Sequence, residues 1–215
     1  MINLPTSLLI TRIITLLIAF TIHELSHALV ATALGDDTPR RDGRLTLNPL
    51  KHLDLWGCIM LIVTGFGWAK PVRVNLRSVT RKTKAGMMLT AAAGPLSNLL
   101  LAILGAFLLR SQVLPKTLIP GLIWLPKTDY FLKNFILTNL TLMVFNLVPL
   151  APLDGEKVVG YFIPGSFKRT WQLIQSHGSQ ILMILFFVLP YARITFASEI
   201  ISNLSYSLYR IILGG

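Results

Sequence analysis

Cysteine is almost absent from this sequence, and acidic residues are few. Cys58 is the one cysteine among 215 residues, which excludes an internal disulfide bond and any cysteine-rich zinc module. Nine Asp and Glu stand against 20 Lys and Arg, giving a formal net charge of +11. The chain has neither a nucleic-acid recognition motif nor a separate basic domain, so we do not expect it to bind nucleic acid. Basic residues of this kind are typical of cytoplasmic loops and of contacts with anionic lipid headgroups.

Long apolar runs dominate instead. Hydrophobic residues make up 53% of the chain, and the mean hydropathy is +0.65. A helix needs about 20 apolar residues to cross a hydrocarbon core. We therefore predict one integral membrane domain over residues 1–215, an all-α polytopic bundle of about four to six transmembrane helices. The first predicted helix ends near Gly35, and two more are predicted at 85–109 and 134–153. Two further apolar stretches follow at 181–190 and 194–213.

A polar block follows the first apolar run and contains patterns typical of strands. Residues 44–47 alternate between polar and apolar side chains and have turn residues on both sides, which predicts a short strand. Residues 55–69 are uncharged but short and contain three glycines, which favours a re-entrant or interfacial segment. Residues 67–75 alternate again, as a strand that could pair with an extended substrate or as a plain interfacial hairpin. The predicted fold thus includes a small interfacial β-element or re-entrant segment near the site.

The first apolar run contains the motif H-E-x-x-H at His23, Glu24 and His27. These are the only ionisable residues between Arg12 and Asp36, and ionisable groups inside a membrane helix are costly and usually functional. Residues four apart share one helix face, so both imidazoles can bind one metal ion. Zinc is the usual occupant, and a catalytic zinc site has three protein ligands and a water. Glu24 could accept a proton from that water, because the metal lowers its pKa to about 7.

A third ligand must then come from elsewhere in the chain, and Asp154 is the candidate. Pro149 and Pro152 must break or kink the helix predicted at 134–153. Asp154 lies two residues after Pro152 and is presented from irregular backbone. The alternative is that the two histidines and the glutamate form a hydrogen-bonded polar cluster between helices.

Asn98 is a polar residue within the second predicted helix, in the segment Gly94-Pro95-Leu96-Ser97-Asn98. Its amide could donate to a reacting oxygen. It could equally tie two helices together, because interhelical hydrogen bonds of this kind are common in membranes. The sequence does not choose between the two roles.

The combination of motifs resembles the site-2 protease family of intramembrane zinc metalloproteases. H-E-x-x-H, G-P-x-x-N and N-x-x-P-x-x-x-L-D-G occur in the family's order between residues 23 and 155. The resemblance implies that His23, His27 and Asp154 bind one zinc ion and that Glu24 is the catalytic base.

The resemblance also implies roles for residues outside the ligand set. Asn98 would position substrate or stabilise the oxyanion, and Asn146 and Pro149 would shape the loop that presents Asp154. We add Trp68 and Lys70 to Asn146 and Pro149 as candidate substrate-binding residues.

Family resemblance further implies the cleavage of transmembrane peptides or proteins near the cytosolic side of a membrane. The chain is similar to the short, single-domain members, without a stretch for a PDZ or CBS domain. Ten of the 20 Lys and Arg fall within 36–84 and four within 110–133, which favours a cytosolic active site. The expected partners are a transmembrane substrate and membrane lipids.

Two other classes of protein remain open at this point. A metal-ion transporter could use His23, Glu24, His27 and Asp154 as a transit site, although such sites usually draw ligands from several helices. A catalytically inactive binding protein is the third possibility, but no ligand or base is missing.

Overall fold

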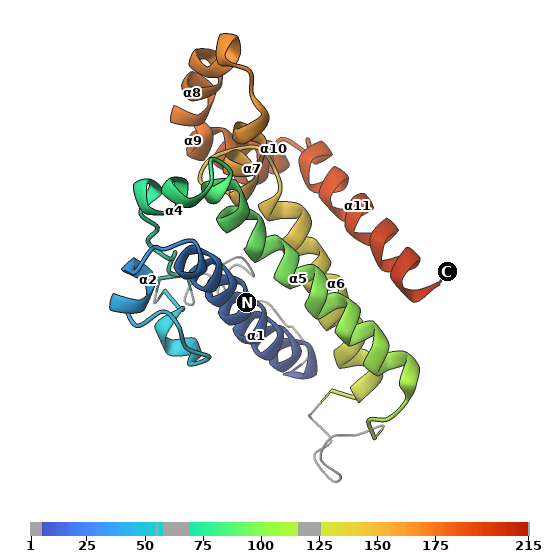
Figure 1. Cartoon of the computed structure of the whole chain (residues 1–215). Helices are drawn as coiled ribbons and strands as arrows, with labels where there is room; N and C mark the ends of the chain where they lie inside the picture. The colour runs from blue at the N-terminus through green and yellow to red at the C-terminus, as the bar shows by residue number, and fades with distance from the viewer. Residues whose placement is uncertain (1–5, 55, 58–68, 116–125, 215) are drawn as a thin grey trace.

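The computed structural model describes residues 6–54, 56–57, 69–115 and 126–214. Within these ranges the chain is helical (Figure 1). The first half contains α1 (Thr6–Ala33), α2 (Thr38–Arg41), η1 (Pro49–Lys51), α4 (Leu76–Lys82) and α5 (Gly86–Ser111). The second half contains α6 (Thr128–Asn146), α7 (Asp154–Phe162), η2 (Gly165–Phe167), α8 (Lys168–Ser176), α9 (Gly178–Met183), η3 (Ile184–Val188), α10 (Leu189–Tyr191) and α11 (Phe196–Leu213).

Helices α1, α5, α6 and α11 form the body of the molecule (Figure 1). α5 lies between α1 and α6 and packs on both, and α11 packs on α6. Small residues let the backbones of α5 and α6 approach closely. Ala102 and Ala106 of α5 meet Ile136 and Leu140 of α6 in a buried cluster. α5 therefore contacts both α1 and α6, and side chains of α5 can bind residues of either helix.

Among the described residues, two helices, α1 and α5, are long and apolar enough to cross a membrane. A bent pair, Gly165–Ser176 with Gly178–Tyr191, would make a third span if its two arms count as one. These helices are consistent with a membrane protein and confirm the first two predicted runs. The prediction of four to six spans is not confirmed in the described ranges.

The third predicted span differs from the helix that forms. α6 begins at Thr128 rather than near residue 134, and it ends at Asn146 rather than near 153. Its early start brings Asp129 and Lys133 into the helix, where they form an exposed ion pair one turn apart. Its early end follows from the two prolines downstream, which have no amide hydrogen for a helical bond.

The predicted β-element does not form in the described residues, where the one ladder contact is an isolated antiparallel bridge between Leu53 and Ala69. Residues 70–75, here called the strap, have no regular secondary structure and lie beside helices and loops. Their backbone amides bind other partners: Lys70 N–H donates to His52 O at 2.8 Å, and Asn75 N–H donates to Asp36 Oδ2 at 2.6 Å. The predicted strand 44–47 is also absent. The re-entrant segment and residues 67–68 lie outside the described ranges.

The two C-terminal apolar stretches, 181–190 and 194–213, lie in two separate helical units. α8 and the run α9–α10 bend by 56° at a break before Gly178, and α11 is a separate helix. Gly178 is buried against Ala151, where an added Cβ would lie 2.5 Å from the Ala151 carbonyl oxygen. The corner between α8 and α9 therefore sits on the loop that precedes α7.

Candidate metal centre

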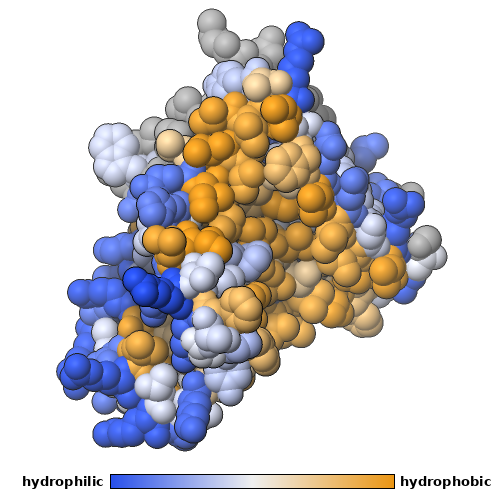
Figure 2. All heavy atoms as spheres, turned by 90° about the horizontal axis from the view of Figure 1, so that it is seen from above, coloured by the Kyte–Doolittle hydropathy of each residue, from blue (hydrophilic) through white to orange (hydrophobic). Residues whose placement is uncertain are grey.

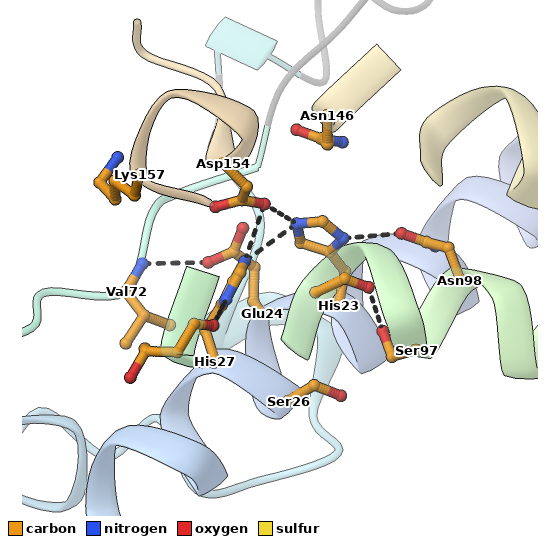
Figure 3. Close-up of polar contacts among 12 residues, drawn as sticks. His23, Glu24, Ser26, His27, Val72, Ser97, Asn98, Asn146, Asp154 and Lys157 are labelled. Carbon is orange, nitrogen blue, oxygen red and sulfur yellow. Dashed lines mark hydrogen bonds and ion pairs between the residues drawn. The ribbon is translucent and has the colours of Figure 1, made fainter. Parts of the chain in front are cut away.

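His23 and His27 lie one turn apart on the buried face of α1, and both side chains turn toward α5 (Figure 3). They are 6% and 8% exposed. Gly94 of α5 provides the room for them, because a Cβ at this position would lie 2.6 Å from Nε2 of His23. A close approach of two helices thus leaves the two ring nitrogens facing a shared space.

Asp154 completes a group of three ligand atoms at this space. Its Oδ2 lies 3.2 Å from Nε2 of His23 and 3.2 Å from Nε2 of His27, and the two Nε2 atoms are 3.1 Å apart. Ligands about 2.0 to 2.2 Å from a tetrahedral zinc ion lie about 3.3 to 3.6 Å from one another. The three donor atoms therefore have close to the spacing of one face of a tetrahedral zinc site, and their role as zinc ligands stays a prediction.

The partners of the other ring nitrogens support this interpretation. His27 Nδ1 lies 2.7 Å from the carbonyl oxygen of Thr90, which can only accept, so Nδ1 carries the hydrogen and Nε2 has a lone pair. His23 Nδ1 lies 2.7 Å from Oδ1 of Asn98 and donates in the same way. Two lone pairs and a carboxylate then face one point, an arrangement that repels unless a cation occupies it. Outer partners that hold the histidines in this way are typical of zinc sites.

Glu24 lies beside the ligands and is itself 8% exposed. Figure 3 shows its side chain pointing toward the space shared by His27 and Asp154. Its Oε2 accepts a hydrogen bond of 3.0 Å from the backbone N–H of Val72 in the strap. The candidate base is therefore held by the same segment that runs across the site.

The strap is fixed by two groups outside the ligand set. The Arg44 guanidinium, which is 6% exposed, donates to the carbonyl oxygens of Lys51, Lys70 and Pro71 at 2.6, 3.1 and 3.3 Å. Asp36, directly after α1, accepts from the N–H of Asn75. Burial by itself would raise the pKa of the Asp36 carboxyl, but hydrogen bonds from Thr38 and Asn75 hold that pKa below its ordinary value.

Asp154 is presented by a loop at residues 147–153, between α6 and α7. The loop turns tightly, with bonds from Val148 N to Phe145 O and from Leu153 N to Leu150 O. Asp154 is the first residue of α7, where a negative charge is favoured by the helix dipole. The broken helix expected from the two prolines is present.

The other predicted site residues are not part of the group of three ligand atoms. Asn98 is fully buried, with its Nδ2 donating to Asn139 Oδ1 at 3.0 Å. Asn146 turns its side chain back to the carbonyl oxygen of Leu142, and Lys70 is exposed on the strap. The Pro149 carbonyl oxygen accepts from Gln175. Trp68 lies outside the described residues.

Several residues at the site were missed by the sequence interpretation. Thr90 contributes only a backbone carbonyl, which leaves no trace in the sequence. Gln175 lies in an amphipathic helix far along the chain and has no motif around it. Asn139 had a visible signal, a polar residue in an apolar helix seven positions before Asn146, which places both on one helix face.

Comparison with known proteins gives relatives of one kind. The chain is 44% identical over 187 residues to a Bacillus subtilis (strain 168) protein named "Putative zinc metalloprotease YwhC", an overlap of 85% of this chain and 82% of the relative. The chain belongs to the site-2 protease family of zinc metalloproteases. No protein-family profile and no solved structure matches the chain.

Two mycobacterial relatives of this zinc metalloprotease chain are both named "Putative zinc metalloprotease Rip2". The protein of Mycolicibacterium smegmatis is 31% identical over 179 residues, and that of Mycobacterium tuberculosis H37Rv is 29% identical over 174 residues. Each overlap covers 79% of this chain but only 63% and 64% of the relatives, slightly less than two thirds of their length. The shared names support a metallopeptidase that uses zinc.

Proposed function

We propose that this protein is an intramembrane zinc endopeptidase that hydrolyses peptide bonds of membrane-embedded substrates. The observation that supports it is the meeting of His23, His27 and Asp154 at one point beside Glu24, inside a helix apolar enough to span a membrane. A transporter needs metal access from two sides, and no feature of the described residues favours it.

The depth of the site supports the intramembrane assignment. His23 and His27 lie ten and six residues before the end of α1 at Ala33. With a rise of about 1.5 Å per residue, these distances correspond to about 15 and 9 Å along the helix. Both values fall within a hydrocarbon core of about 30 Å.

Glu24 is the proposed general base. Zinc held by the three ligands would lower the pKa of a bound water and polarise the scissile carbonyl. The Glu24 carboxylate takes a proton from the attacking water and returns it to the leaving amine. The Val72 N–H keeps the carboxylate in place for both transfers, because it binds Oε2 and leaves the second oxygen to face the site.

The strap is the proposed contact for substrate. A peptide must be extended to expose its carbonyls, and a segment beside the site can pair with it through main-chain hydrogen bonds. The amides of Lys70, Val72 and Asn75 are already bound, so the other main-chain groups of the strap would make these bonds. Val72 and Val74 are half-buried, whereas Lys70, Arg73 and Asn75 between and around them are exposed. Lys70 at the start of this segment stays a proposed substrate contact, and so does Trp68, which lies outside the described residues.

Glu24→Gln tests the function directly. Glutamine keeps an oxygen that can accept from Val72 N–H, so the strap and the ligands should stay in place. We expect cleavage of a synthetic transmembrane peptide to fall by at least about 100-fold, since general acid–base catalysis contributes about 10²- to 10⁴-fold. Bound zinc, measured by elemental analysis of protein purified in detergent, should be unchanged.

The outcomes separate the classes of function. Cleavage that persists in the Glu24→Gln variant would remove Glu24 from the mechanism. Zinc in both proteins with cleavage by neither, over a panel of transmembrane peptides, would count against a protease. Metal uptake into proteoliposomes that is lost in Asp154→Ala would then favour the transporter.

A further inference from the structure

A chain of buried hydrogen bonds runs from His23 through α5 to the backbone of α6. His23 Nδ1 lies 2.7 Å from Asn98 Oδ1, and Asn98 Nδ2 lies 3.0 Å from Asn139 Oδ1. Asn139 Nδ2 in turn lies 2.8 Å from the carbonyl oxygen of Phe135. Asn98 and Asn139 are both 0% exposed, so water does not compete for these groups.

The far end of this chain determines the direction of every bond in it. The Phe135 carbonyl can only accept, so the Asn139 group that faces it must be the NH₂ group. The Asn139 oxygen then faces Asn98 and accepts from the Asn98 NH₂ group. This leaves the Asn98 oxygen toward His23, where it accepts from Nδ1–H. The hydrogen on Nδ1 leaves Nε2 of His23 with a lone pair facing Asp154.

His27 needs no such chain. Its Nδ1 donates directly to the Thr90 carbonyl, which cannot exchange roles. An asparagine side chain can rotate by half a turn and present NH₂ in place of oxygen. If Asn98 did so, His23 Nδ1 would accept, its hydrogen would move to Nε2, and the ring could no longer bind a metal through that atom.

We propose that Asn139 is a positioning residue that fixes the tautomer of His23 through Asn98 and so keeps Nε2 available to zinc. The inference rests on the proposed function only in that zinc is the ion to be bound. Leaving a buried NH₂ group without an acceptor is costly, and this cost prevents the Asn98 amide from turning over. Asn139 touches no ligand atom of the metal itself.

A plain helix tie is the competing interpretation, because the Asn98–Asn139 bond also joins α5 to α6. Both roles predict that Asn139→Leu lowers stability. They differ when Asn98 is replaced by aspartate. A carboxylate has no donor end, so it accepts from His23 Nδ1–H whichever way it is turned and makes Asn139 unnecessary for the tautomer.

The experiment measures zinc affinity by chelator competition in detergent for the wild type, Asn139→Leu and the double variant Asn98→Asp/Asn139→Leu. We expect Asn139→Leu to weaken zinc binding by about 10- to 100-fold, the usual effect of losing an outer partner of a ligand histidine. We expect the double variant to recover most of that loss. Asn134→Leu is the matched control, because half-buried Asn134 of α6 also donates to a carbonyl four residues back, at Tyr130, but through an exposed hydrogen bond. It should bind zinc as the wild type does.

A second readout is independent of zinc. Nitrogen-15 NMR of selectively labelled histidines in metal-free protein reports which ring nitrogen carries the hydrogen. The wild type should show His23 protonated on Nδ1, and Asn139→Leu should show a substantial Nε2–H population. This measurement on the wild type can refute the proposal even if Asn139→Leu fails to fold.

Three results would overturn the proposal: an equal loss of zinc affinity whether residue 98 is Asn or Asp, no loss in Asn139→Leu, or a His23 ring in the wild type that carries its hydrogen on Nε2 and none on Nδ1. These outcomes are separate from those for the protease. Zinc binding that follows the expected pattern without peptide cleavage would keep the positioning role and reject the protease. Peptide cleavage without the expected pattern of zinc affinities would keep the protease and reject the positioning role.

Discussion

At the scale of single residues, the space for the ligand atoms depends on a glycine. His23 and His27 have bulky rings on one face of α1, and α5 crosses directly over them. A Cβ at Gly94 would overlap Nε2 of both His23 and His27. Glycine is therefore needed at this position because it has no side chain, which leaves room for the two imidazole rings between α1 and α5.

Gly94→Ala should remove the metal site while keeping the helix, since alanine is a good helix former. The added methyl would force both rings away from Asp154, and overpacking of this kind costs about 1–3 kcal/mol. We expect zinc content near zero and a lower melting temperature in detergent. Gly165→Ala is the control, because nothing lies within 4 Å of its added Cβ. A Gly94→Ala protein with a full zinc content would show that the rings can move without losing the site.

At the scale of elements, the third ligand depends on a contact from the C-terminal helices. Gln175 of α8 binds the loop at 147–153 twice. Its Oε1 accepts from the Ala151 N–H at 2.7 Å, and its Nε2 donates to the Pro149 carbonyl at 3.1 Å. The two prolines leave this loop with few amide hydrogens of its own, so an outside side chain supplies part of its order. α8 thereby helps to hold Asp154 against α1.

Gln175→Leu should loosen the loop without touching a ligand. Both loop groups would lose their partners, and we expect zinc to bind about 10-fold more weakly, at the low end for an outer-shell change because water can replace part of the contact. Chelator competition measures the effect. Gln172→Leu, an exposed glutamine on the same helix, should leave the affinity unchanged. An equal effect of the two substitutions would mean that α8 acts through its general packing.

At the scale of the whole molecule, the surface fits a lipid environment. Figure 2 shows a continuous hydrophobic area on one face, with hydrophilic side chains gathered at its margins. Exposed apolar residues follow one side of α5 at helical spacing, at Leu96, Leu100, Ile103 and Phe107. A row of this size is too apolar for water and is expected to face acyl chains.

The proposed orientation places α4 in the cytosol and the start of α6 outside, and these two elements lie toward opposite ends of the long helices (Figure 1). In a Cys58→Ser background, Lys127→Cys should react with a membrane-impermeant maleimide on intact cells. Arg77→Cys should react only after the cells are permeabilised. The reverse pattern would place the metal site near the outer face and contradict the positive-inside argument.

The sequence alone determined the features that depend on near neighbours. The two histidines share a face because they are four residues apart in a helix, and the apolar runs that became α1 and α5 follow from composition. Pro149 and Pro152 ended α6 because a missing amide hydrogen is a local property. These features of the helices were predicted correctly.

Tertiary structure decided the contacts between distant segments. Asn98 meets His23 across 75 positions and Asn139 across 41, and which atom of each amide faces which partner depends on how three helices pack. The strap lies where a strand was expected because its amides bind Glu24 and Asp36 of the α1 end rather than a neighbouring strand. Helix spacing is a local rule of the backbone, whereas the partner of a buried polar group is fixed only when the helices have come together.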